Sequence, residues 1–190
     1  MVKTVKAIID FVMDILETIV FVGSIFIVVY LFILTPNQVK GDSMEPNFHT
    51  GDYILTSRIT YKFRRIERGD VVVLKSPKNP DIEYIKRVIG LPGETLVIKD
   101  GIVSIDGKVI QENYISDTTN LWEGECIKNG EPYKIPEDEV FVMGDNRPRS
   151  SDSRKFCSVP INSLVGQVFY RYFPPGQIGW IKNPLPETLR

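Results

Sequence analysis

The chain has 190 residues, 43% hydrophobic and 25% charged, a composition typical of one globular domain with appendages rather than a disordered chain. The formal net charge is −1, so the basic footprint of a nucleic-acid-binding protein is missing. The single histidine, His49, argues against most metal sites and against a serine–histidine–aspartate triad.

The first predicted element is a helix that crosses a membrane. Residues 18–34 carry no charge, and with the two apolar residues before them the run reaches about 20 residues, enough to span a bilayer. A buried core helix is disfavoured because the run is hydrophobic on all sides. A cleavable signal peptide is disfavoured because no A-x-A-like site follows the run. We therefore expect an uncleaved signal anchor.

The charges beside this helix predict its orientation. Lys3, Lys6 and the amino terminus outweigh Lys40 at the other end, which by the positive-inside rule places the N-terminus in the cytoplasm. The expected organisation is a short cytoplasmic segment at 1–14, a transmembrane signal anchor at 15–35, and an extracytoplasmic β-rich catalytic domain at 36–190.

After Pro36 the pattern changes to short apolar runs separated by turn residues. Asp100-Gly101 and Asp106-Gly107 lie between such runs, and Asp-Gly is a strong hairpin signal, so 95–110 is predicted to be a meander of three strands. Residues 112–136 are polar and turn-rich and predict a surface excursion. The other predicted strands are Tyr53–Thr56, Val71–Leu74, Ile82–Leu91, Val140–Met143 and Leu164–Tyr172.

No predicted strand alternates with an amphipathic helix, which disfavours a βαβ architecture. We expect a mostly β body with a coiled or half-barrel sheet, preceded by one transmembrane helix.

A serine and a lysine are the candidate reactive pair. Ser43 lies in a polar loop, Gly41–Pro46, just after the apolar run, and Lys86 lies on the longest predicted strand. A serine hydroxyl needs a base, and a lysine acts as one only if its pKa, ordinarily about 10.4, falls by about 2–3. Burial among apolar neighbours supplies such a shift. Taken singly, a turn-capping serine and a surface lysine are the simpler interpretations.

A third block, Gly144–Arg154, holds a turn followed by closely spaced acids and arginines. Its simple interpretation is a salt-bridged surface loop, and a serine within it, Ser150, is a candidate to hydrogen-bond the lysine amine. Cys126 and Cys157 match no zinc spacing. A disulfide between them, if the body lies outside the cytosol, and two separate thiols both remain open.

Together these blocks resemble type I signal peptidase, the bacterial membrane-bound serine endopeptidase that removes signal peptides from exported preproteins. The resemblance covers essentially the whole chain. It rests on four stretches: Ser43–Pro46, Arg68–Val73, Tyr84–Glu94 and Gly144–Arg154.

The resemblance implies a role for each matching residue. Ser43 is the nucleophile, its backbone N–H donates into the oxyanion hole, and Lys86 is the general base. The residues implied to orient the lysine and to support its loop are Ser150, Asp152, Arg154, Asp145 and Arg87.

Two positions depart from the family pattern. Gly41 stands where some members have a serine that donates to the oxyanion, which leaves the second donor open. Cys157 stands where a glycine is expected, which favours a bridge to Cys126.

The resemblance also implies the partners and the setting. The substrates are preprotein signal peptides with small residues at −1 and −3, and no cofactor, metal or nucleic acid is expected. The protein is expected to cross the bacterial inner membrane once, near the protein export channel.

Two alternative functions fit the same sequence features less well. One is a Ser-Lys self-cleaving repressor-type protease, which the membrane anchor and the lack of a DNA-binding module disfavour. The other is an anchored β-domain that binds peptides without cutting them, for which three family blocks are not expected.

Overall fold

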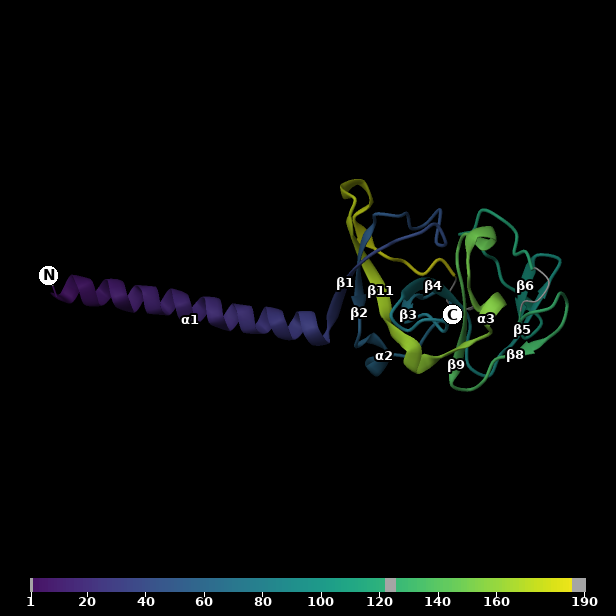
Figure 1. The fold of residues 1–190 in the computed structure, drawn as a ribbon, viewed down its shortest axis with the longest axis horizontal. Helices are drawn as coiled ribbons and strands as arrows, with labels where there is room; N and C mark the ends of the chain where they lie inside the picture. Colours follow the sequence, from purple (N-terminus) through teal and green to yellow (C-terminus); the bar gives the residue numbers. More distant parts are fainter. Residues whose placement is uncertain (1, 122–125, 186–190) are drawn as a thin grey trace.

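Helix α1 (Val2–Phe32) leads into a body made mainly of strands (Figure 1). The structure, a computed structural model, describes residues 2–121 and 126–185. Residues Thr4–Tyr30 are long and apolar enough to cross a membrane, and none of the most apolar window is buried by the rest of the chain. The helix begins earlier than the expected anchor at 15–35, because the few charges of the first turns do not break a helix.

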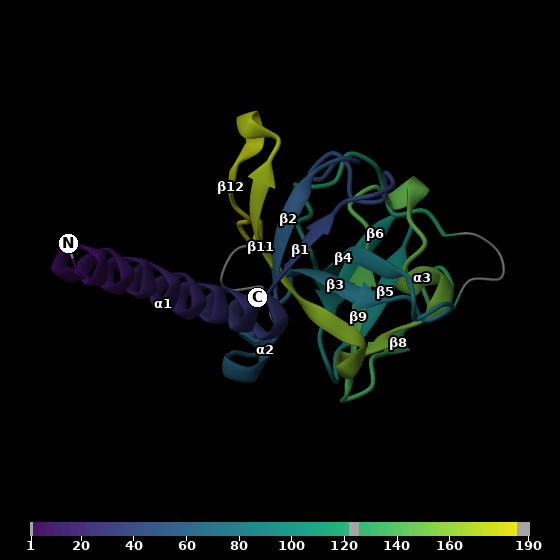
Figure 2. The ribbon, with the colours of Figure 1, turned by 60° about the vertical axis from the view of Figure 1, so that its left-hand side comes forward.

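Within the described residues, eight strands form the larger sheet. Its order is β1 (Leu34–Gln38), β2 (Tyr53–Ser57), β11 (Leu164–Phe173), β3 (Val71–Lys75), β4 (Glu83–Gly90), β9 (Glu139–Met143) and β10 (Val159–Pro160), with β12 (Gly179–Trp180) beside β11. Every strand pair is antiparallel, and the sheet curls into a half-barrel (Figure 2). The predicted fold class is confirmed.

Strand β1 was not predicted from the sequence, in which the change to strands was placed after Pro36. The strand lies at the edge of the sheet and pairs only with β2, from Leu34 opposite Ser57 to Gln38 opposite Tyr53. A proline is tolerated in an edge strand because its missing N–H removes no ladder bond on the open side. The chain therefore passes directly from α1 into the sheet.

A smaller sheet of four strands covers one end of the body. It contains β5 (Thr95–Lys99), β6 (Ile102–Ile105), β7 (Lys108–Val109) and β8 (Tyr133–Lys134). The first three form the predicted meander, with both Asp-Gly turns at positive φ, as type I′ hairpins require. This prediction is confirmed.

Residues 112–136 pack against the rest of the body more closely than the predicted surface excursion would. Tyr114, Ile127 and Ile135 are each at most 7% exposed and pack into the core between the two sheets, and β8 pairs with β5. The prediction is wrong for these side chains, because isolated apolar residues in a polar stretch give no periodic signal. Residues 122–125 lie outside the described part of this segment.

Short helices connect the strands. They are α2 (Thr60–Phe63) and α3 (Ser153–Phe156), with 3₁₀ turns η1 (Arg147–Arg149), η2 (Ile161–Ser163) and η3 (Pro175–Gln177).

Candidate active site

Ser43 lies in the turn that follows β1, and two buried side chains hold that turn against the body. Met44 is fully buried and Phe48 is 1% exposed, in a core cluster with Val39 and Ile54. The Phe48 N–H also donates to the Met44 carbonyl at 2.9 Å. Ser43 itself is half-buried, so its hydroxyl is fixed in position but reachable.

Lys86 is on β4, opposite Val72 of β3, and is only 3% exposed. Its Nζ is 2.8 Å from Ser43 Oγ and donates to the Ile85 carbonyl at 2.8 Å. The ring of Tyr84, two residues earlier on the same face, lies 5.3 Å from Nζ. The structure therefore brings the two predicted reactive residues into direct contact.

Burial lowers the pKa of Lys86 from its ordinary value to about 8. Removal of the ammonium from water disfavours the charged form. The negative charges of Asp152 and Asp145 act in the opposite direction, without offsetting the burial. A substantial share of this amine is consequently neutral near physiological pH, as a general base requires.

The third sequence block packs directly against the serine turn. Asn146 N–H donates to the Ser43 carbonyl at 3.0 Å. A side chain at Gly144 would place its Cβ 2.4 Å from that same carbonyl and 2.3 Å from Ser150 Oγ. Because real Cβ contacts are never so short, only glycine fits here.

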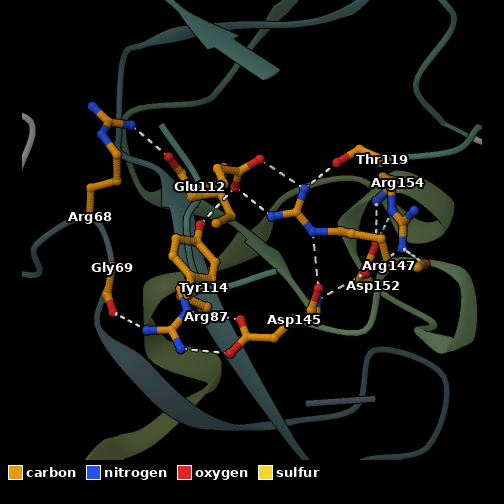
Figure 3. Close-up of polar contacts among 12 residues, drawn as sticks. Arg68, Gly69, Arg87, Glu112, Tyr114, Thr119, Asp145, Arg147, Asp152 and Arg154 are labelled. Atoms are coloured by element: carbon orange, nitrogen blue, oxygen red, sulfur yellow. Dashed lines mark hydrogen bonds and ion pairs between the residues drawn. The ribbon is translucent and has the colours of Figure 1, made fainter. Parts of the chain in front are cut away.

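A buried ion pair joins the third block to the lysine strand (Figure 3). Arg87 donates through Nε and Nη2 to the two carboxylate oxygens of Asp145, at 2.8 and 2.6 Å. Its Nη1 donates to the Gly69 carbonyl at 2.9 Å, and the Tyr114 ring stacks 4.4 Å from the guanidinium. Lys86 and Arg87 point to opposite faces of the strand, so this pair fixes β4 without facing the amine.

Asp152 and Arg154 form a second buried pair in the same block. Arg154 donates to Asp152 through Nε and Nη2, both at 2.8 Å, and Gly144 N–H donates to Asp152 at 3.0 Å. Burial opposes ionisation of Asp152, but the Arg154 hydrogen bonds and charge and the Gly144 N–H together hold its pKa below the ordinary value. Asp152 therefore stays a carboxylate and also caps α3.

Ser150 is 3% exposed, and its hydroxyl, which helps to lower the pKa of Asp152, makes no hydrogen bond to the Lys86 amine. The predicted hydrogen bond from Ser150 to the lysine amine is thus not formed in this arrangement. The amine contacts Ser43 and the Ile85 carbonyl instead.

Arg147 of the third block forms a buried ion pair that was not predicted from the sequence. Arg147 is completely buried; it donates to Glu112, at 2.9 Å for the Nη1–Oε2 contact, and to the Thr119 hydroxyl. Both partners come from the segment interpreted as a surface excursion. The sequence did contain a signal for this pair. The loop was predicted to pack against the lysine strand, and an arginine buried there, such as Arg147, needs an acidic partner.

A cleft opens beside Ser43 and Lys86. Its volume is about 150 Å³, and it is lined by β1, by the residues after it and by the beginning of β4. Among the described residues, β4 pairs with β9 only from Arg87 onward, so backbone groups of 83–86 on that side are open to an extended peptide. The Ser43 N–H donates to no group among the described residues.

No three His, Cys, Asp or Glu side chains are arranged to hold a metal ion in the described part of the chain. The two cysteines form a disulfide, Cys126–Cys157, with a Cα–Cα distance of 5.4 Å. The Cys126 N–H also donates to the Arg154 carbonyl at 2.8 Å. The sequence had left it undecided whether this disulfide forms. In the structure it forms and supports the loop that carries Asp152 and Arg154.

Comparison with known proteins identifies the family. The model of signal peptidase, peptidase S26, matches residues 12–173. This chain belongs to the signal peptidase family. Signal peptidase IB of Staphylococcus aureus (strain MRSA252) is 33% identical over 185 residues, which cover 90% of this chain and 96% of that protein.

Two further signal peptidases are similar to this chain. A probable signal peptidase I-1 of Synechocystis sp. is 34% identical over 158 residues, covering 78% of this chain and 77% of that protein. A crystal structure of a signal peptidase I from Enterococcus faecalis V583 is 34% identical, covers 55% of this chain and 97% of that one, and has a TM-score of 0.46. The family resemblance predicted from the sequence is confirmed.

Proposed function

We propose that this signal peptidase cleaves preproteins with Ser43 as nucleophile and Lys86 as general base. Members of the family are membrane serine endopeptidases that remove signal peptides. The observation that carries the residue assignment is the 2.8 Å contact between Ser43 Oγ and a buried lysine amine whose pKa is lowered to about 8.

The proposed reaction proceeds in two halves. Neutral Lys86 accepts the Ser43 proton as Oγ attacks the scissile carbonyl carbon, and the resulting oxyanion is stabilised by the Ser43 N–H. The C–N bond breaks, the leaving amine takes the proton from Lys86, and the signal peptide remains as an ester on Ser43. Water then gives a proton to Lys86 as it attacks the ester. The bond from the carbonyl carbon to Ser43 Oγ breaks, Lys86 returns the proton to Oγ, and the signal peptide leaves as a carboxylate after losing a proton to solvent.

The surrounding ion pairs have a positioning role in this proposal. Arg87 and Asp145 fix the strand that carries the lysine, while Asp152 and Arg154 fix the loop that lies against the serine turn. Ser150 is proposed to orient the Lys86 amine during the reaction. Once Lys86 is protonated, the Ser150 hydroxyl can accept a hydrogen bond from it in place of Ser43 Oγ.

Cleavage after small residues fits the cleft. A volume of about 150 Å³ is well below the roughly 300–1,000 Å³ typical of pockets for drug-sized ligands. A preprotein segment extended along the open edge at 83–86 would direct alternate side chains into it. We therefore assign the small residues at −1 and −3 to this cleft.

We further propose that α1 crosses the bacterial inner membrane once, with the N-terminus cytoplasmic and the catalytic domain extracytoplasmic, near the export channel. The helix is uncovered by the rest of the chain and long enough to span a bilayer. Ser43 follows Leu34 by nine positions, so it lies within about 30 Å of the membrane exit along the chain. Signal peptides emerging from the membrane would meet the serine there.

Incubation of the purified full chain with a model preprotein tests the residue assignment. Ser43→Ala and Lys86→Ala should each abolish cleavage after the A-x-A site, while Ser104→Ala and Lys99→Ala, on the smaller sheet, should cleave at the wild-type rate. Substantial cleavage by either active-site variant would refute the pair. Self-cleavage alone would favour the repressor-type alternative, and binding without products would favour the peptide-binding alternative.

A further inference from the structure

A second functional surface lies where α1 enters the body. The segment 58–66, which contains α2 and is called here the α2 loop, begins at the end of the long helix: Arg58 N–H donates to the Ile33 carbonyl at 2.9 Å, and Ser57 pairs with Leu34. Both views place α2 beside the last turn of α1 (Figures 1 and 2). Where α1 leaves the bilayer at its carboxyl end, as proposed, the α2 loop lies close to the exit.

The side chains of this loop are cationic and apolar. Between residues 58 and 67 four side chains are basic and one is acidic. Lys62 and Arg65 are exposed, and Phe63 between them is 84% exposed, so an aromatic ring and two cations share one exposed surface. Arg64 is different, because it is held at 2.8 Å by the buried Asp70 and so fixes the loop to the body.

A cleft opens behind these side chains. It has a volume of about 620 Å³ and combines an apolar wall with the basic residues of the loop. The apolar wall consists of Tyr61, Ile66, Leu91, Pro92 and Ile161. A cleft of this size is within the roughly 300–1,000 Å³ range that holds a small-molecule ligand. It is separate from the Ser43 cleft, with which it shares no lining residue.

We propose that the α2 loop binds the head group of an anionic phospholipid. Lys62 and Arg65 pair with the phosphate and the anionic head group, Phe63 enters the interfacial layer, and the upper part of an acyl chain occupies the apolar cleft. Cations and aromatic rings at the depth of the head groups are the usual means of interfacial anchoring. The inference rests on the proposed bilayer crossing of α1 and not on the peptidase activity.

The position of the loop favours lipid over other anionic partners. Nucleic acid and acidic peptides are not concentrated at the head-group layer, whereas phospholipid is always present there. The pairing of Ser57 with Leu34 also leaves the loop no freedom to move far from that layer. A membrane surface is therefore the partner that meets these side chains first.

Photo-crosslinking of the full chain in nanodiscs tests the proposal. Phe63 is replaced by p-benzoylphenylalanine, the nanodiscs contain phosphatidylcholine with a minority of phosphatidylglycerol, and the adducts are identified by mass spectrometry. We expect lipid adducts in which phosphatidylglycerol exceeds its share of the bilayer about three-fold or more. The additional substitutions Lys62→Gln and Arg65→Gln should return that ratio to the bilayer share.

Matched controls use the smaller sheet, which faces away from α1. The photo-crosslinker at Val109, which is 59% exposed, should give no lipid adduct. Lys99→Gln with Lys108→Gln, both exposed, should leave the phosphatidylglycerol enrichment at position 63 unchanged. The proposal is overturned by an absence of lipid adducts at position 63, by adducts at the bilayer ratio, or by an enrichment that survives the loss of Lys62 and Arg65. Because no readout involves cleavage, the result is independent of whether Ser43 and Lys86 are the reacting pair.

Discussion

In the proposed mechanism, catalysis depends on one lysine whose charged form is destabilised by burial. Lys86 has its pKa lowered to about 8 by burial, so the neutral fraction of the amine rises with pH up to that value and then levels off. We expect the rate of preprotein cleavage to rise about ten-fold per pH unit well below 8 and to reach a plateau above it. Cleavage by the full chain in detergent, measured at saturating and at low substrate, checks the profile.

An exposed lysine provides the control for this profile. Lys99→Gln removes a cation from the smaller sheet and should leave the midpoint near 8. A rate that is already maximal well below pH 7, or one that still rises tenfold per unit above pH 9, would show that Lys86 is not the titrating base.

Gly144 is the residue at which a single methyl group should disturb the site. Its Cβ would lie 2.4 Å from the Ser43 carbonyl, a backbone atom that cannot move aside alone. Gly144→Ala should therefore shift the serine turn and reduce kcat by about 10²-fold or more, the scale expected for misplacement of a reacting group. Gly176→Ala is the matched control, because no atom lies within 4 Å of its Cβ.

Measurements of kcat, KM and thermal unfolding together decide the Gly144 prediction. The variant should lose kcat while it still unfolds cooperatively, since the clash is local. A Gly144→Ala enzyme with kcat within a few-fold of Gly176→Ala would mean that the turn has more room than the structure gives it.

The residues of the site were predictable to different degrees, for a physical reason. Ser43, Lys86 and the Arg87–Asp145 pair were predicted because they lie within short blocks that together resemble a known family, and the fold brings these blocks together. Glu112 was not predictable, because a single acid in a polar stretch looks the same whether it faces water or a buried arginine. Only the tertiary structure shows that it pairs with Arg147.

At the scale of elements, strands with a strong local sequence pattern were predicted, and strands with a weak pattern were not. The strands joined by Asp-Gly turns were predicted because both turn and alternation agree. Strand β1 was not, because its proline is tolerated only at a sheet edge, and edge position is a property of the complete sheet. The two-residue strands β8, β10 and β12 are likewise too short to produce any periodicity.

The disulfide is the element-scale feature whose contribution to stability can be measured. Cys126–Cys157 closes a loop with a sequence separation of 31, which corresponds to about 3–4 kcal/mol in the chain-entropy model. Cys126→Ser with Cys157→Ser should lose about that much free energy of unfolding. Cys157 has φ +67° and ψ −172°, a backbone region that is essentially restricted to glycine. Cys126→Ser with Cys157→Gly should therefore recover about 1 kcal/mol or more of the loss.

Urea unfolding of the full chain in detergent, with and without reductant, compares these proteins. Reductant should lower the midpoint of the wild type and leave both double variants unchanged. If the serine and glycine double variants are equally stable, the backbone at position 157 relaxes once the bridge is removed.

At the scale of the whole molecule, two independent features support the side of the membrane that is proposed for the body. Lys3, Lys6 and the amino terminus precede α1, whereas Lys40 is the one basic residue within about 20 positions after it. The disulfide of the body, Cys126–Cys157, forms and persists in an oxidising compartment rather than in a bacterial cytosol. Charge and redox chemistry thus both support the proposed orientation, with a cytoplasmic N-terminus and an extracytoplasmic body.

Alkaline phosphatase fused after Arg190 tests this orientation, because the enzyme is active only outside the cytosol, where its disulfides form. We expect activity for the native chain and, since the charge difference across α1 is small, a measurable loss for Lys3→Gln with Lys6→Gln. Lys40→Gln should preserve or increase the activity, because it removes the opposing positive charge that follows the helix most closely in the sequence. Inactive fusions, together with residues 40–190 accessible to protease only from the cytosolic side, would reverse the assignment and place the α2 loop against the inner leaflet.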